Sequence, residues 1–80
     1  MNVLITGTSS GIGRGCAEYF LNEGHHVYGF DKDAATIQHP EYIHFCLDIR
    51  DKSSYPELPS VDILINNAGV QDKDDIDVNL

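Results

Sequence analysis

The chain has 80 residues, 41% of them hydrophobic, and a formal net charge of −8 at pH 7. This length is enough for one small domain with a single core. Five Lys and Arg residues are too few to build the basic stripe that nucleic-acid binding requires, and the acidic excess disfavours anionic membrane surfaces. The composition therefore predicts small-molecule or protein partners, with no nucleic acid and no membrane among them.

Cysteine usage and the first residues bear on the compartment. Cys16 and Cys46 show neither metal-ligand spacing nor a disulfide framework, which predicts two buried, inert thiols in a reducing environment. The opening residues, MNVLITG, contain no basic segment and no long apolar run, so we expect neither export nor membrane insertion. Together these features predict a cytoplasmic protein.

The first predicted strand is Asn2–Thr6, a short apolar and β-branched run bounded by glycine. A helix is predicted at Gly11–Asn22, and Gly24 is placed to end it. Helical spacing assigns four residues to the buried face of that helix: Ile12, Cys16, Tyr19 and Phe20.

The remaining predicted elements follow in quick succession. A second strand is predicted at His26–Phe30, ending on Asp31, and a third at Tyr42–Leu47. Between them a short helix is predicted at Ala34–Gln38, ended by the His39-Pro40 pair. Two prolines then allow at most a brief helical connection before a fourth strand at Val61–Asn66.

Strands that alternate with helical connections imply a parallel sheet with right-handed crossovers. The pattern therefore predicts an α/β fold: the first half of a Rossmann-type doubly wound sheet, with four strands in the order 3-2-1-4.

A glycine-rich stretch, TGTSSGIG at residues 6–13, lies between the first strand and the helix. Glycines there let the backbone turn sharply and approach an anion, and the first N–H groups of the helix attract a pyrophosphate. Gly15 is expected to let the helix pack closely on the sheet. A turn shaped only for packing is the alternative interpretation, whereas a Walker-type loop is excluded because its Gly-Lys-Ser/Thr sequence is missing.

Asp31 follows the second strand, close to twenty residues beyond the loop. A carboxylate at this place accepts both hydroxyls of an adenine ribose. A 2′-phosphate would face a like charge, at a cost of roughly several kcal/mol, which favours NAD and makes NADP the less suitable cofactor. The alternative is that Asp31 only caps the end of its strand.

Three features in the right order resemble the short-chain dehydrogenase/reductase family. They are the loop TGTSSGIG, the acidic residue Asp48 after the third strand, and NNAG at residues 66–69. The family resemblance implies cofactor contacts from Gly7, Ser9, Ser10, Gly11, Ile12, Gly13, Asp31, Asp48, Ile49, Asn66, Ala68 and Gly69. It also implies that Asn79 is a catalytic asparagine, although the interval between NNAG and this residue is shorter than is usual in the family.

The resemblance implies an NAD(H)-dependent oxidoreductase acting on a secondary alcohol or carbonyl, such as a 3-oxoacyl-type reductase, and a homo-oligomer when full length. The family's catalytic serine, tyrosine and lysine belong to the second half of its domain, so residues 1–80 are expected to be the N-terminal part of one NAD(P)-binding domain, inactive alone. The alternative is a non-catalytic nucleotide-binding or interaction module. A methyltransferase is disfavoured because NNAG would then have no explanation.

Overall fold

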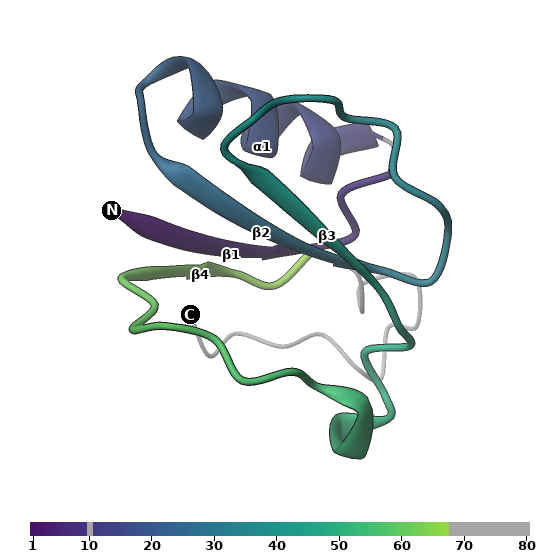
Figure 1. Ribbon diagram of the computed structural model, residues 1–80. Coiled ribbons are helices and arrows are strands. Elements are labelled where there is room, and N and C mark those ends of the chain that lie inside the picture. The colour runs from purple at the N-terminus through teal and green to yellow at the C-terminus, as the bar shows by residue number, and fades with distance from the viewer. Residues whose placement is uncertain (10, 68–80) are drawn as a thin grey trace.

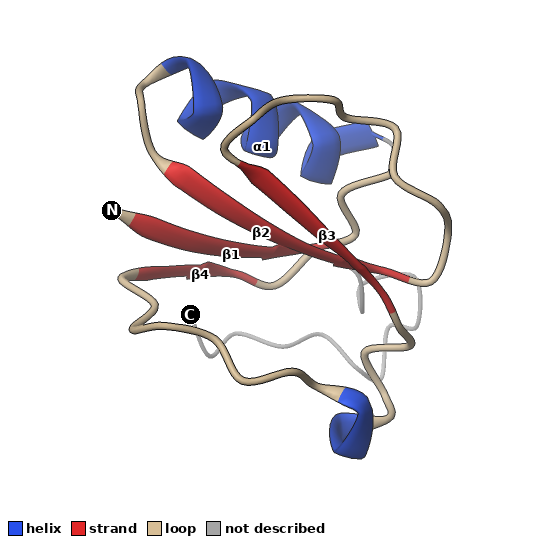
Figure 2. Cartoon of the chain, viewed as in Figure 1, coloured by secondary structure: helices blue, strands red, loops and turns tan. Residues whose placement is uncertain are grey.

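The computed structural model describes residues 1–9 and 11–67. Its elements, in chain order, are β1 (Asn2–Thr6), α1 (Gly11–Asn22), β2 (His26–Asp31), β3 (Tyr42–Cys46), a single 3-10 turn η1 (Lys52–Ser54) and β4 (Ile63–Ile65). Helix and strands are distinguished by colour in Figure 2.

The four strands form one sheet in the order β3-β2-β1-β4. All three pairings are parallel, and Val3 in the central strand β1 stands beside Val27 of β2 and Ile63 of β4. This arrangement confirms the predicted fold class and strand order, a Rossmann-like α/β half.

Helix α1 covers one face of the sheet, and the connection from β3 to β4 runs past the other (Figure 1). The core lies beneath α1, where Val3, Ile5 and Val27 are at most 1% exposed and pack with Ala17 and Leu21 of the helix. The burial of these side chains is the main favourable term that holds α1 on the sheet.

On the opposite face, aromatic rings cover the carboxyl half of the sheet. Phe30 meets Phe45 edge to face at 5.8 Å between ring centroids, and Tyr55 of the β3–β4 connection lies 5.1 Å from Phe30. The tyrosine therefore fastens that connection beneath the end of β2.

The buried face of α1 differs from the one that spacing predicts. Ile12 and Tyr19 are 76% and 61% exposed, whereas Gly13, Ala17 and Leu21 are buried. These three residues recur every four positions and form the face toward the strands, which carries the small residues Gly13 and Ala17 near the loop and the larger Leu21 farther along the helix. The prediction was correct only for Cys16 and Phe20, which are half-buried against the core.

The predicted helix at residues 34–38 is wrong, because this stretch of the β2–β3 crossover has no regular structure. The Ala34 carbonyl accepts a hydrogen bond from the Ser9 hydroxyl at 2.9 Å, and Thr36 Oγ1 donates to the Ser9 carbonyl at 2.7 Å. These bonds hold the crossover extended against the glycine-rich loop, and Ile37 fixes it further by burying its side chain in the core.

Strand ends were predicted less well than strand positions. Regular β3 ends at Cys46, not Leu47, and β4 spans Ile63–Ile65, half of the predicted 61–66. The predicted burial of both cysteines is also wrong, because Cys46 is exposed and Cys16 only half-buried. Cys46 ends an edge strand, where only one neighbouring strand shields it.

No helix within residues 1–9 and 11–67 is both long enough and apolar enough to cross a bilayer.

Candidate functional site

The glycine-rich loop leaves the carboxyl end of β1 and enters α1 on the edge of the sheet where β2 also ends (Figure 1). Gly7 and Gly11 have φ angles of +75° and +63°, which side chains other than glycine rarely adopt. The Gly7 amide donates to the Phe30 carbonyl at 2.7 Å and ties the start of the loop to β2.

Gly13 is required for a different reason, which is close approach. A Cβ placed on it would lie 1.9 Å from the Gly7 carbonyl oxygen and 2.8 Å from Nδ2 of Asn67. The predicted packing role of Gly15 is wrong, because Gly15 is exposed and a Cβ there would meet nothing within 4 Å. The first turn of α1 therefore rests directly on the loop through Gly13.

The amino end of α1 is open to solvent. Gly11 and Ile12 are exposed, and a Cβ on Gly11 would have nothing within 4 Å apart from its chain neighbours and the backbone of its own helix. N–H groups in the first turn of a helix have no acceptor within the helix, and the helix dipole adds positive potential there. Such a site can hold an anion such as a phosphate group.

Ser9 joins the loop to the segment that follows β2. Its backbone N–H donates to Oδ2 of Asp31 at 3.0 Å, and its side chain bonds to the crossover at Ala34. Because Ser9 is only 7% exposed, the structure gives its hydroxyl a partner within the protein. A contact between this hydroxyl and a bound phosphate stays a prediction.

Asp31 is half-buried at the end of β2, beside the loop. Its Oδ1 accepts a hydrogen bond from the Asp33 backbone N–H at 2.8 Å, while Oδ2 accepts the one from Ser9. An ionised carboxylate has about four lone-pair positions, so two further donors can be accepted. The arrangement thus places an oriented carboxylate next to the anion-attracting end of α1.

Two asparagines after β4 brace the other side of the loop. Thr6 Oγ1 donates to Oδ1 of Asn66 at 3.0 Å and accepts from the Asn67 backbone N–H at 2.8 Å. Nδ2 of Asn67 donates to the Gly7 carbonyl at 3.4 Å. The structure therefore brings Gly7, Gly13, Asn66 and Asn67 together at the carboxyl end of the central strands.

Comparison with known proteins adds to this geometry. The sequence profile of the family described as short chain dehydrogenase matches residues 1–79. The chain belongs to the short-chain dehydrogenase family. This confirms the family predicted from the TGTSSGIG loop, Asp48 after the third strand and the NNAG segment.

One curated relative of this short-chain dehydrogenase chain is the protein named "Uncharacterized oxidoreductase C162.03" from Schizosaccharomyces pombe. The two are 35% identical over 77 residues, which cover 84% of this chain and 26% of the relative. The chain thus spans about a quarter of the length of the curated relative that it matches. No solved structure matches the chain significantly.

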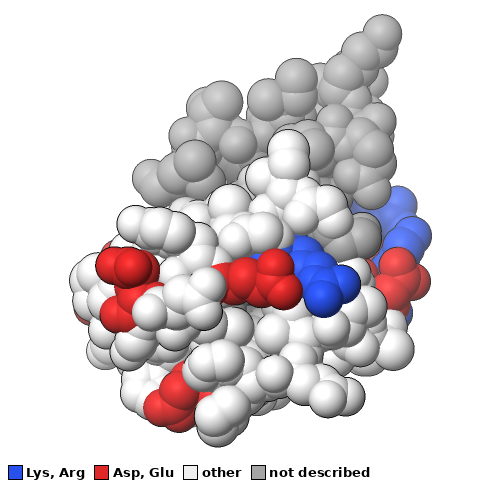
Figure 3. All heavy atoms as spheres, turned by 90° about the horizontal axis from the view of Figure 1, so that it is seen from above, with Lys and Arg blue, Asp and Glu red and all other residues white. Residues whose placement is uncertain are grey.

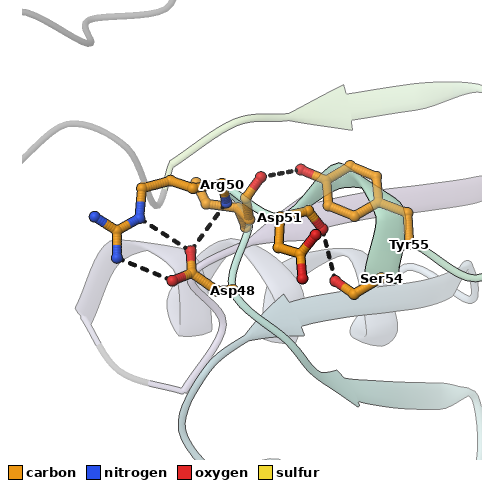
Figure 4. A network of polar contacts seen from close by, with 6 residues as sticks. Asp48, Arg50, Asp51, Ser54 and Tyr55 are labelled. Carbon is orange, nitrogen blue, oxygen red and sulfur yellow. Dashed lines mark hydrogen bonds and ion pairs between the residues drawn. The ribbon is translucent and has the colours of Figure 1, made fainter.

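Asp48 lies after β3 in this short-chain dehydrogenase chain and binds Arg50 (Figure 4). Its two oxygens accept from Nε and from one terminal nitrogen of the guanidinium at 3.1 and 2.9 Å, and the Arg50 backbone N–H also donates to it. The hydrogen bonds from the Arg50 side chain lower the pKa of Asp48 to about 2, although the side chain is 41% exposed. Nearby, the carbonyl of Ile49 accepts a hydrogen bond from the Tyr55 hydroxyl.

This ion pair gives a prediction about pH. The folded pKa of Asp48 is below its usual 3.8, so the stabilisation is complete above the unfolded pKa and is lost as the pH falls toward 2. Carbon NMR titration of the carboxyl group should therefore show a midpoint near 2, and Arg50→Gln should move the midpoint back toward 3.8. A midpoint unchanged by Arg50→Gln would contradict the assigned cause.

Four predicted site residues, Ser10, Ala68, Gly69 and Asn79, lie outside the described residues. The Asp48 side chain is bonded to Arg50 and the Ile49 carbonyl to Tyr55, and their predicted contact with an adenine stays a prediction. Among residues 1–9 and 11–67, no group of three His, Cys, Asp or Glu side chains is arranged to hold a metal ion.

A hollow of about 470 Å³ lies on the flank of α1, between the helix and Thr36–His39 of the crossover. Its lining includes Arg14, Glu18 and Leu21, but no residue of the TGTSSGIG loop. The open amino end of α1, not this hollow, therefore carries the features expected of a short-chain dehydrogenase.

Sequence reasoning missed one group of residues beside the loop. Thr8 is fully buried, and its hydroxyl lies 2.6 Å from the hydroxyl of Tyr42, which in turn lies 2.6 Å from Nδ1 of His44. The available signal was Gly29, since a glycine inside a strand often marks a place where another group approaches closely. The group matters for the site because it connects the loop to β3.

Proposed function

We propose that this chain binds the adenosine and pyrophosphate portion of NAD for an oxidoreductase. The observation that carries the proposal is the bond from the Ser9 amide to Asp31, which sets a carboxylate beside the open amino end of α1. Pyrophosphate suits the unpaired N–H groups of the first turn, and the two ribose hydroxyls suit the free acceptor positions of Asp31.

The preference for NAD over NADP rests on the charge of Asp31. A 2′-phosphate would approach a carboxylate that is already fixed by Ser9 and Asp33 and has no counter-ion among its described bonds. Like charges brought together in this way repel. The nearby Lys32 is exposed, so solvent weakens any compensation that it offers.

The whole protein is proposed to transfer hydride between nicotinamide and a secondary alcohol or carbonyl, which is the chemistry that the cofactor supplies when bound. Family membership and the printed name of the yeast relative, an oxidoreductase, support this reaction class. A 3-oxoacyl compound is one substrate of the right chemistry. The residues described here would bind and orient the cofactor, and the groups that act on the substrate would come from other parts of the protein.

The surface is consistent with a small-molecule partner. Figure 3 shows the face that carries α1. Among the residues described on this face, acidic and basic side chains are scattered among uncharged ones, with no continuous basic stripe. We also propose a cytoplasmic location and a homo-oligomer for the whole protein, the first from the composition and the second from the family resemblance.

Calorimetric titration of the complete protein with NAD and NADP tests the binding, and an absorbance assay for reduced nicotinamide with a panel of secondary alcohols tests the reaction. We expect NAD to bind at least about 10-fold more tightly than NADP, a difference of about 1.4 kcal/mol. Binding without any turnover would favour the alternative, a nucleotide-binding module without catalysis. No binding of either dinucleotide would refute the proposal.

A further inference from the structure

A chain of three hydrogen bonds connects the glycine-rich loop to the crossover. It runs from Thr8 Oγ1 to the Tyr42 hydroxyl at 2.6 Å, from that hydroxyl to Nδ1 of His44 at 2.6 Å, and from Nε2 of His44 to the Asp33 carbonyl at 2.9 Å. This series of hydrogen bonds thus starts at Thr8 in the loop after β1, continues through Tyr42 and His44 of β3, and ends at Asp33, two residues after Asp31.

The direction of each bond follows from the last one. A carbonyl oxygen only accepts, so Nε2 of His44 carries a hydrogen, and we assign the tautomer in which Nδ1 carries none and is the acceptor. The Tyr42 hydroxyl therefore donates to His44 and accepts from Thr8. Thr8, Tyr42 and His44 thus each donate one hydrogen to the next group, so that all three hydrogen bonds run in the same direction.

Tyr42 is suited to the middle position because its hydroxyl stays protonated. Burial raises the pKa of Tyr42 above its usual 10.0, the bond with Thr8 lowers it, and the negative charge of Asp31 raises it further. The hydroxyl therefore remains both a donor and an acceptor throughout the physiological pH range.

Gly29 of β2 leaves the space in which the chain is built. A Cβ on Gly29 would lie 2.0 Å from the Tyr42 hydroxyl oxygen and 2.5 Å from Thr8 Oγ1. Any larger residue at position 29 would therefore displace these hydroxyls from their present positions without removing a polar group.

The far end of the chain acts on the peptide groups next to Asp31. The Asp33 carbonyl accepts its shortest hydrogen bond from His44, at 2.9 Å, and two longer ones of 3.4 Å from the side chains of Ser9 and Cys46. The Asp33 N–H donates to Oδ1 of Asp31 at 2.8 Å. Fixing Asp33 thus fixes one of the two bonds that orient the carboxylate, while Ser9 supplies the other.

We propose that Tyr42 is a positioning residue for the adenine-ribose site, acting through His44 and Asp33 to hold the Asp31 carboxylate in the orientation that selects NAD. The inference rests on the proposed function, because the selectivity of Asp31 matters only if the chain binds a dinucleotide.

Two variants of the complete protein interrupt this series of hydrogen bonds in different ways. Tyr42→Phe removes the central hydroxyl, and Gly29→Ala displaces it while keeping every polar group. Tyr19→Phe is the matched control, because it removes the same atom from a tyrosine that is 61% exposed on α1. Affinities for NAD and NADP are measured by calorimetry, and the exchange of the Asp33 amide hydrogen by NMR.

We expect Tyr42→Phe and Gly29→Ala each to weaken NAD binding by about 10-fold, as loss of one or two oriented hydrogen bonds implies, and to weaken NADP binding less. The NADP-to-NAD ratio of dissociation constants should therefore fall by several-fold, with faster exchange at Asp33. Equal losses for both cofactors would mean a general loss of stability and would overturn the inference, as would affinities equal to those of Tyr19→Phe. If the unaltered protein binds neither cofactor, the proposed function fails instead.

Discussion

Gly13→Ala is expected to destabilise the protein by roughly 3 kcal/mol, the upper end of what overpacking costs, and to abolish dinucleotide binding. The new methyl group would lie 1.9 Å from the Gly7 carbonyl oxygen and 2.7 Å from the Gly7 carbonyl carbon, both of which are main-chain atoms. Gly7 cannot retreat easily, because its N–H is bonded to the Phe30 carbonyl. Urea unfolding and calorimetric titration of the complete protein measure the two effects.

Gly15→Ala is the matched control in the same helix. A Cβ there meets nothing within 4 Å, and alanine is favoured over glycine in a helix interior by up to about 1 kcal/mol. This variant should bind NAD normally and be at least as stable as the unaltered protein. If the two alanine variants behaved alike, the close contact between α1 and the loop would not be required.

Asp31→Ala is expected to weaken NAD binding by about 100-fold, because hydrogen bonds to a charged group are worth about 1.5–3 kcal/mol each. NADP should lose much less, since its 2′-phosphate would no longer face a carboxylate. Calorimetric titrations with both cofactors give the two dissociation constants and therefore their ratio.

The control for charge is Asp33→Ala, which removes a carboxylate from an exposed residue only two positions away. The bonds that orient Asp31 involve the backbone of Asp33 and not its side chain. This control should therefore keep the preference for NAD. Equal losses of NAD and NADP in Asp31→Ala would sink the ribose assignment.

The strands were predictable because buried parallel strands appear as short apolar runs. The bounds of β1 and α1 agree with the prediction, and so does the stop at Gly24, whose φ is +87°. These features depend on residues that are close together in the sequence, which is the information that periodicity and turn chemistry use.

The buried face of α1 was not predictable from apolar spacing, because spacing gives weight to large residues such as Ile12 and Tyr19. The loop brings α1 so near to the sheet that Gly13 and Ala17 must occupy the contact face. The crossover was missed for a related reason. Its course depends on bonds to Ser9, more than twenty positions away.

The candidate site divides in the same way. The positions of Gly7, Gly11 and Gly13 and the place of Asp31 follow from spacing along the chain. The hydrogen bonds from Thr8 through Tyr42 to His44 join residues up to 34 positions apart, so no local pattern reveals them. The one indication in the sequence is Gly29, a glycine in the middle of a strand, where the side chains of Thr8 and Tyr42 approach the backbone closely.

The pairing of β1 with β4 has a consequence for the order in which the protein folds. Asn2 bonds to Ser60 and Asp62, and Asn67 supports Thr6 and Gly7. Bringing together two segments about 60 residues apart costs roughly 4 kcal/mol of chain entropy. The contacts between them offset this cost only after the two segments have met. During synthesis the glycine-rich loop therefore leaves the ribosome about 60 residues before Asn66 and Asn67, the two asparagines that brace it.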